Sequence, residues 1–127
     1  MGISTYLANK LLDHVLTGDT YTSPTTLHIS LHSADPGLIG SYELSGSAYA
    51  RITATFDAAD GGATQTATEL ESAMATPSNW SEATHFGIWD AASGGNFLMG
   101  GELDSAVTVL INYEALFPDG SIIVSLT

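Results

Sequence analysis

The spacing of apolar residues changes near Pro24, and this change constrains the fold more than any other feature of the chain. Between residues 3 and 17 apolar residues recur about every four positions, which predicts one amphipathic helix. The recurring residues are Ile3, Leu7, Leu11 and Val15. After Pro24 apolar and polar residues alternate, as in residues 26–32, which predicts half-buried strands.

Turn residues separate the alternating segments, for example Asp35-Pro36-Gly37 and Pro118-Asp119-Gly120. Residues 107–112 alternate as well and are expected to form a strand. Roughly six to eight such strands indicate a mainly β fold, an antiparallel β-sandwich or jelly-roll-like domain with one N-terminal amphipathic α-helix. We expect residues 1–22 to form the helix and a connector, and residues 23–127 to form the β-sandwich domain.

The charge of the chain excludes one class of partner. Lys10 and Arg51 are its two basic residues, against 14 carboxylates, and the formal net charge is −12. Nucleic-acid binding depends on Lys and Arg side chains that neutralise phosphates, so we expect no nucleic-acid partner. The same charge disfavours docking to an anionic membrane surface. Since there is no cysteine, disulfides, thiolate metal sites and cysteine nucleophiles are excluded.

Catalysis requires titratable groups that converge, and no motif in the sequence predicts such a group. A nucleophile elbow, a phosphate-binding loop and a zinc-protease helix are all missing. Pairs such as Glu69 and Glu71 resemble a glycosidase pair, but they are expected by chance among 14 carboxylates. We therefore expect no catalytic residue and no cofactor, with a hydrolase as the third choice among functions.

The histidines are the natural candidates for a metal site. His28 and His32 share one face of a predicted strand, but residues four apart on a strand are separated by about 13 Å. A joint site needs His85 or a carboxylate from another strand. We expect no metal site, and histidines that face solvent or are hydrogen-bonded.

Two apolar surfaces are suited to contact with neighbouring subunits. The first is the helix stripe, with Leu7, Leu11 and Val15, although packing of the helix on its own domain remains open. The second is the loop 37–47, which carries more large apolar side chains than a connector needs. Its candidate residues are Leu38, Ile39 and Tyr42.

Trp80 lies in a polar segment, so we expect it to be exposed and to be a possible ligand contact. Together with Trp89 or Tyr42 it forms a candidate aromatic platform for stacking sugars.

Several segments, taken in order, carry a family resemblance. They are Leu27 to Gly37 (LHISLHSADPG), Tyr49-Ala50-Arg51, His85 to Asp90 (HFGIWD), Gly94-Gly95 and the opening helix from Met1 to Leu16. Over nearly its whole length the chain resembles a family of small tailed-phage and prophage virion proteins, commonly labelled tail-fibre-like or minor structural proteins. The matching residues include no family active site.

The resemblance implies a non-enzymatic structural protein of the virion, either tail-associated or capsid-decorating, that is made in the cytoplasm of the host bacterium. Its implied partners are other virion proteins, capsid or tail subunits, and further copies of itself in a homo-oligomer, where avidity compensates for weak contacts. The alternative is a carbohydrate-binding module that recognises a host surface glycan.

Overall fold

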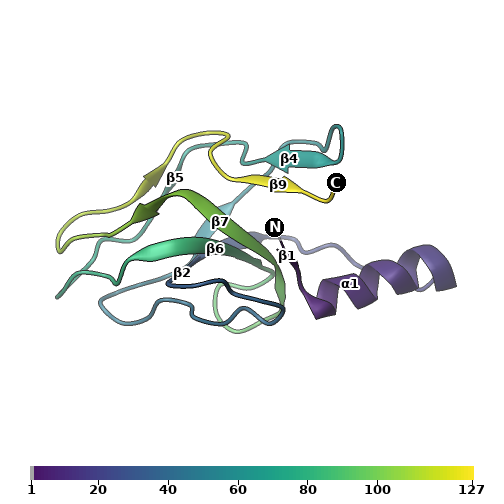
Figure 1. Cartoon of the computed structure of the whole chain (residues 1–127), viewed down its shortest axis with the longest axis horizontal. Helices are drawn as coiled ribbons and strands as arrows, with labels where there is room; N and C mark the ends of the chain where they lie inside the picture. Colours follow the sequence, from purple (N-terminus) through teal and green to yellow (C-terminus); the bar gives the residue numbers. More distant parts are fainter. Residues whose placement is uncertain (1) are drawn as a thin grey trace.

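The computed structural model describes residues 2–127, which form mainly antiparallel strands with one N-terminal helix (Figure 1). This confirms the predicted mainly β class. The largest sheet has five strands in the order β1-β7-β6-β2-β3. Their bounds are Gly2–Ile3 for β1, Leu27–His32 for β2, Ile52–Ala54 for β3, Ala83–Trp89 for β6 and Phe97–Val107 for β7.

Two short ribbons accompany this sheet. In the first, β4 (Ala63–Gln65) pairs with β9 (Ile123–Ser125). In the second, β5 (Leu70–Glu71) pairs with β8 (Leu116–Phe117). The hydrophobic core draws side chains from the large sheet and from both ribbons. Its members include Ile29, Phe86, Ile88, Leu98, Leu70, Phe117 and Val124.

The predicted helix is present but begins at Thr5 and not at Ile3, because Ile3 pairs with Met99 in the short strand β1. Helix α1 covers Thr5–Leu12 and continues into a π-helical turn, η1, over Asp13–Thr17. The Ser4 hydroxyl accepts a hydrogen bond from the Leu7 N–H at 3.0 Å, and Gly18 ends the helix with a φ of +77°. Figure 1 shows that the helix extends away from the sheet. No helix among residues 2–127 has the length and apolar character needed to cross a membrane.

The predicted half-buried strand at 26–32 is wrong in one respect, because both faces of β2 are covered. Ser30 and His32, on the face expected to meet solvent, are completely buried. The cause is loop 33–47, which folds back over this face. Its Ser41 carbonyl lies 2.6 Å from Nδ1 of the His32 side chain, and Pro36 is buried within it.

The predicted strand at 107–112 is also wrong. Strand β7 ends at Val107, and the chain then leaves the sheet. Val109 is buried, whereas Leu110 and Ile111 are exposed. Beyond Val107 the backbone no longer pairs with a neighbouring strand. The N–H of Ile111 instead donates to the Asn79 side chain at 2.7 Å.

Candidate functional site

A group of converging polar side chains holds loop 33–47 against the sheet. Arg51 donates from Nε and Nη2 to the two carboxylate oxygens of Glu43, each at 2.9 Å. The Tyr49 hydroxyl donates to the same carboxylate at 2.8 Å and accepts from the Leu31 N–H at 3.1 Å. Burial alone raises the pKa of Glu43, but the hydrogen bonds from Arg51 and Tyr49 outweigh it and leave that pKa below its ordinary value.

All three guanidinium nitrogens of Arg51 are engaged within the chain. Besides the two that bind Glu43, Nη1 donates to the carbonyls of Ala91 and Gly94, both at 2.8 Å, and the guanidinium lies 3.8 Å from the ring centroid of Trp89. The side chain is 7% exposed. The residue therefore joins three segments of the chain and acts as a structural clamp.

A second chain of hydrogen bonds passes through His32. The Trp89 Nε1–H donates to Ser30 Oγ at 2.8 Å, and Ser30 Oγ lies 2.6 Å from His32 Nε2. His32 Nδ1 lies 2.6 Å from the Ser41 carbonyl, which can only accept. Nδ1 therefore carries the proton and Nε2 accepts from the serine hydroxyl. Burial lowers the pKa of His32, which favours this neutral form.

Ser30 and His32 have the contact expected of a nucleophile and its base, but both are inaccessible to a substrate. Their role in this structure is to anchor loop 33–47. No pattern in the sequence indicated this network, because alternation placed both side chains in solvent.

The histidines do not gather around a common point. Among residues 2–127, no three His, Asp or Glu side chains lie closely enough to hold a metal ion. His85 lines a hollow of about 330 Å³ together with Asp35 and Glu102. It pairs with His32 across β2 and β6, but the His32 ring is turned into the buried network.

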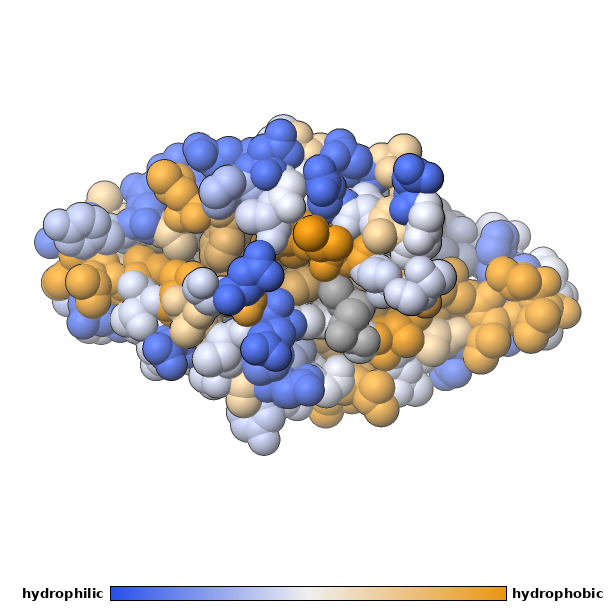
Figure 2. Space-filling view, turned by 45° about the horizontal axis from the view of Figure 1, so that its top comes forward, coloured by the Kyte–Doolittle hydropathy of each residue, from blue (hydrophilic) through white to orange (hydrophobic). Residues whose placement is uncertain are grey.

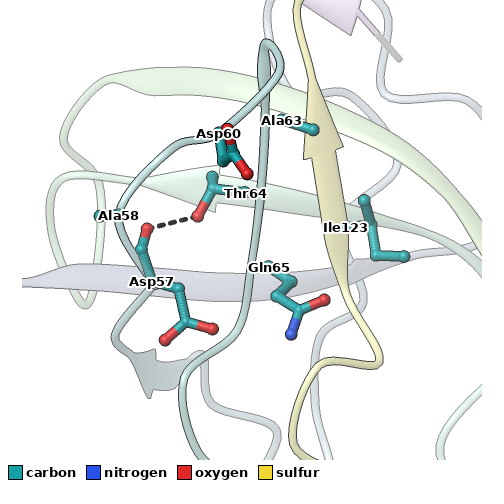
Figure 3. Close-up of a pocket in the computed structure, with 7 residues that line it drawn as sticks. All are labelled: Asp57, Ala58, Asp60, Ala63, Thr64, Gln65 and Ile123. Atoms are coloured by element: carbon teal, nitrogen blue, oxygen red, sulfur yellow. Dashed lines mark hydrogen bonds between the residues drawn. The ribbon is translucent and has the colours of Figure 1, made fainter.

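Another hollow, of about 260 Å³, lies beside β4 and β9 (Figure 3). Asp57, Asp60 and Gln65 supply its polar groups, and the Thr64 hydroxyl donates to the Asp57 carbonyl. Figure 3 shows the Asp57 carboxylate and the Gln65 amide extending into the open space. In the part of the chain that the structure describes, no aromatic side chain lines this hollow, so it lacks a face on which a sugar ring stacks.

The predicted interface residues of the helix differ in exposure. Leu7 is 6% exposed and lies in the chain's own core, so at this residue the helix packs on its own domain, the alternative that the sequence left open. Leu11 is half-buried. From Leu12 onward the helix leaves the domain, and Val15 is 73% exposed. The exposed apolar residues Leu12, Val15 and Leu16 are called the helix-end patch below.

The predicted interface residues of the loop are all exposed. Leu38, Ile39 and Tyr42 lie on the surface, although the loop that carries them is tied down. The Leu38 carbonyl accepts from the N–H of Thr5 at 3.4 Å, so this loop lies beside the first turn of α1.

A further apolar surface escaped the sequence analysis. It is called the far-end patch here and consists of Met74, Leu110, Ile111, Tyr113 and Leu116. Backbone hydrogen bonds unite its two segments, since the Ala75 N–H donates to the Tyr113 carbonyl at 3.0 Å. The sequence did not indicate this patch, because the alternation in residues 107–112 predicts a strand with one face buried in the core.

Trp80 is buried, at 4% exposure, so the prediction that it is an exposed ligand contact is wrong. Its Nε1–H donates to the Ser47 carbonyl at 2.8 Å, and its ring meets the Tyr49 ring edge-on with centroids 5.3 Å apart. The surrounding segment is polar in sequence, but the backbone N–H of Trp80 bonds to the Val109 carbonyl and holds the indole inward.

Comparison with protein-family models finds a match over residues 2–125. The matching model is described as Podophage GP4 fiber I protein gp80. A comparison with curated proteins finds no match.

Proposed function

The chain belongs to the family of the podophage GP4 fiber I protein, and from this premise we propose that it builds its part of the fibre through contacts between copies. Members of a fibre family are non-enzymatic structural components of the virion that associate with other tail components. The resemblance to tail-fibre-like virion proteins is thereby confirmed, and the family favours the fibre over the capsid-decorating alternative.

The observation that carries the proposal is the uncovered helix end. No residue of η1 is buried, and the last helical turns carry the helix-end patch into solvent. A helix of this length is marginal in water unless its apolar face packs against something. A neighbouring subunit that covers the patch removes apolar surface from water, at about 25 cal/mol for each Å² buried.

The same argument extends to loop 37–47. Leu38 lies next to the start of α1, so Leu38, Ile39 and Tyr42 offer exposed apolar contacts at the base of the helix, about 15 Å along its axis from Val15. Each copy carries a net charge of −12, so copies repel one another. This repulsion is weakest where the facing surfaces carry few charged side chains. Apolar contacts repeated over many copies supply the avidity that holds a homo-oligomer together.

We also propose a layered arrangement for residues 23–127, with residues 1–22 as the helix and connector. In this arrangement the large sheet packs on the ribbons as a sandwich. Support comes from a hollow of about 180 Å³ whose lining mixes both parts. The sheet contributes Ile88 and Leu98, and the β4–β9 ribbon contributes Thr64 and Val124.

Imaging of the intact particle combined with hydroxyl-radical footprinting tests the proposal. Val15 and Ile39 are expected to react in the isolated chain and to be protected in the particle. Leu126, exposed on the β4–β9 side, serves as the internal reference. Equal reactivity of all three residues in both samples would reject an interface at the helix or the loop.

Host-glycan recognition is the second candidate function. Of the three aromatic residues considered for it, Tyr42 is exposed, while Trp80 and Trp89 are buried. A glycan array with the wild-type chain and with Tyr42→Ala tests this candidate. Binding that disappears in Tyr42→Ala supports it, and an array without signal for the wild type contradicts it.

A further inference from the structure

The buried imidazole of His32 joins loop 33–47 to the sheet, and its neutral form is the one that fits the site. Nδ1–H donates to the Ser41 carbonyl of the loop at 2.6 Å, and Nε2 accepts from the Ser30 hydroxyl. Ser30 Oγ in turn accepts from the Trp89 Nε1–H at 2.8 Å. Each donor in this series of contacts therefore meets an acceptor.

A second proton on the His32 ring breaks this match. Nε2 then becomes a donor, and it faces a Ser30 oxygen that already accepts from the Trp89 N–H. The hydroxyl proton of Ser30 loses its acceptor, and an imidazolium is left in a completely buried position. On the β6 side there is no room for a compensating water. A Cβ built on Gly87 would lie 2.5 Å from Ser30 Oγ and 2.7 Å from His32 Nε2.

The charged and titratable groups around the ring do not compensate the added proton. Glu43 of the loop favours the imidazolium, but its carboxylate is already bound by Arg51. Arg51 itself and His85, the cross-strand neighbour on β6, oppose it. Strand β7 contributes the uncharged ring of Phe97, with the two ring centroids 6.3 Å apart. Burial has the largest effect, and it lowers the pKa of His32 in the closed structure.

We propose that loop 33–47 is an acid-sensitive latch, which protonation of His32 releases from the sheet while the rest of the domain stays folded. With the loop open, the ring is hydrated and binds a proton as an ordinary histidine does, so acid favours the open form. The net charge of −12 acts in the same direction, and Figure 2 shows blue hydrophilic residues over the middle of the molecule. The inference goes beyond the proposed function and does not depend on whether the loop lies at an interface.

The loop is able to open separately because few of its contacts belong to the core. Among residues 33–47, Leu44 is the one member of the hydrophobic cluster. The Leu44 N–H donates to the Leu31 carbonyl at 2.9 Å, and the Glu43 carboxylate provides the other main attachment. A segment with few buried apolar contacts opens at a lower free energy than the whole domain.

Amide hydrogen exchange of the full chain tests the proposal. Exchange is followed by NMR at pH 7 and pH 5.5, and each rate is divided by the intrinsic rate at that pH. The Leu44 N–H reports the loop. Its protection is expected to fall about eightfold, the change for one histidine that titrates at the ordinary 6.5 in the open form and stays neutral in the closed form.

Dilute urea separates release of the loop from global unfolding, because the urea dependence of exchange scales with the surface that opening exposes. The Leu44 N–H is expected to exchange at a rate that does not depend on urea below the unfolding transition. The Trp80 N–H, bound to the Val109 carbonyl, reports the rest of the domain and is expected to exchange faster as urea is added.

Two variants assign the pH effect to the imidazole. In His32→Gln the protection of Leu44 is expected to be lower than in the wild type at pH 7 and nearly the same at pH 5.5. Ser33→Ala, an exposed change in the neighbouring residue, is the matched control and is expected to keep the eightfold change. An NMR titration of the His32 ring in the wild type needs no variant. Its midpoint is expected below 6.5, and a midpoint at or above 6.5 contradicts the closed neutral network.

Three exchange results also overturn the proposal. The first is equal protection of Leu44 at both pH values. The second is a urea dependence of Leu44 exchange equal to that of Trp80, because the loop is then released only by global unfolding. The third is an unchanged pH effect in His32→Gln. None of these results bears on the fibre role, which footprinting of Val15 and Ile39 in the particle tests separately.

Discussion

Arg51 lies against the indole of Trp89 with its guanidinium carbon 3.8 Å from the ring centroid, while the same guanidinium binds the Glu43 carboxylate. The contact joins loop 33–47 to the turn after β6, where Arg51 also reaches the carbonyls of Ala91 and Gly94. Since Leu38 and Ile39 are carried by this loop, the clamp determines where the exposed apolar residues stand.

Arg51→Ala is expected to lower the free energy of unfolding by about 3 kcal/mol, because removing one partner of a buried pair leaves the other uncompensated. Urea denaturation followed by tryptophan fluorescence measures the change. Lys10→Ala, which removes an exposed cation, is the control and is expected to change stability by less than about 0.5 kcal/mol.

Arg51→Lys separates charge from geometry. Lysine keeps the positive charge but loses the two-pronged contact with Glu43 and the planar contact with Trp89, so we expect it to recover only part of the lost stability. Full recovery in the Arg51→Lys variant would mean that charge alone accounts for the role of the clamp.

The stability of the fold is expected to fall on mild acidification because of His32. Burial holds its pKa in the folded chain below the ordinary 6.5, so the unfolded chain binds the proton first as the pH falls. The free energy of unfolding therefore decreases as the pH drops below about 6.5, and this loss ends below the folded pKa. Glu43 adds a further loss only below 4.5, since its pKa is also lowered.

Urea denaturation at pH 7 and at pH 5 measures how far the free energy of unfolding falls between these two pH values. At pH 7 the His32→Gln variant is expected to be less stable than the wild type. Between pH 7 and pH 5 its free energy of unfolding is expected to fall much less than that of the wild type. Thr108→Gln, an exposed change that removes no titratable group, is the control and should keep the wild-type slope. A His32→Gln chain that retains the full slope would assign the acid sensitivity to other groups.

Gly87→Ala is expected to destabilise the chain by about 2 kcal/mol through overpacking. A Cβ at this position would lie 2.5 Å from Ser30 Oγ and 2.7 Å from His32 Nε2, so the buried hydrogen bonds must shift. Gly2→Ala is the matched control because nothing lies within 4 Å of its Cβ position. Thermal melting curves that coincide for the two variants would contradict the tight packing around Gly87.

The alternation of apolar residues predicted the strands of the sheet but not their coverage. Strand β2 lies where the period of two after Pro24 and the turn Asp35-Pro36-Gly37 place it. Alternation reports which side chains share a face, and it does not report whether a later loop covers the second face. The burial of Ser30 and His32 depends on loop 33–47, whose contacts are long-range in sequence.

The candidate contact surfaces were predictable only in part, because a sequence pattern does not report contacts between residues that are far apart in the chain. Val15, Leu38 and Ile39 are exposed apolar residues in segments whose patterns singled them out. Trp80 was misplaced because a polar neighbourhood in sequence says nothing of a partner such as Ser47, 33 residues away. The far-end patch depends on β7 ending at Val107, and no turn residue in the sequence marks that end.

Both tryptophans are expected to resist quenching by acrylamide. Trp80 and Trp89 are 4% and 9% exposed, and each indole N–H is hydrogen-bonded. The Stern–Volmer constant of the folded chain should be several-fold below that of free indole and should rise to it in guanidinium chloride. Trp80→Phe and Trp89→Phe report the two sites separately, and strong quenching of the single remaining Trp80 would place that ring in solvent.

Association between copies is expected to tighten as ionic strength rises. Each copy carries a net charge of −12, so long-range repulsion opposes the approach of two copies. Salt shortens the reach of this repulsion to about 10 Å at 0.1 M and leaves the apolar contacts intact. Light scattering across a salt series should therefore find larger species at high salt.

Lys10→Glu adds to the negative charge, so its association should be weaker at low salt and should increase more steeply with salt concentration. Weaker association of the wild type at high salt would show that ion pairs, and not apolar patches, hold the copies together.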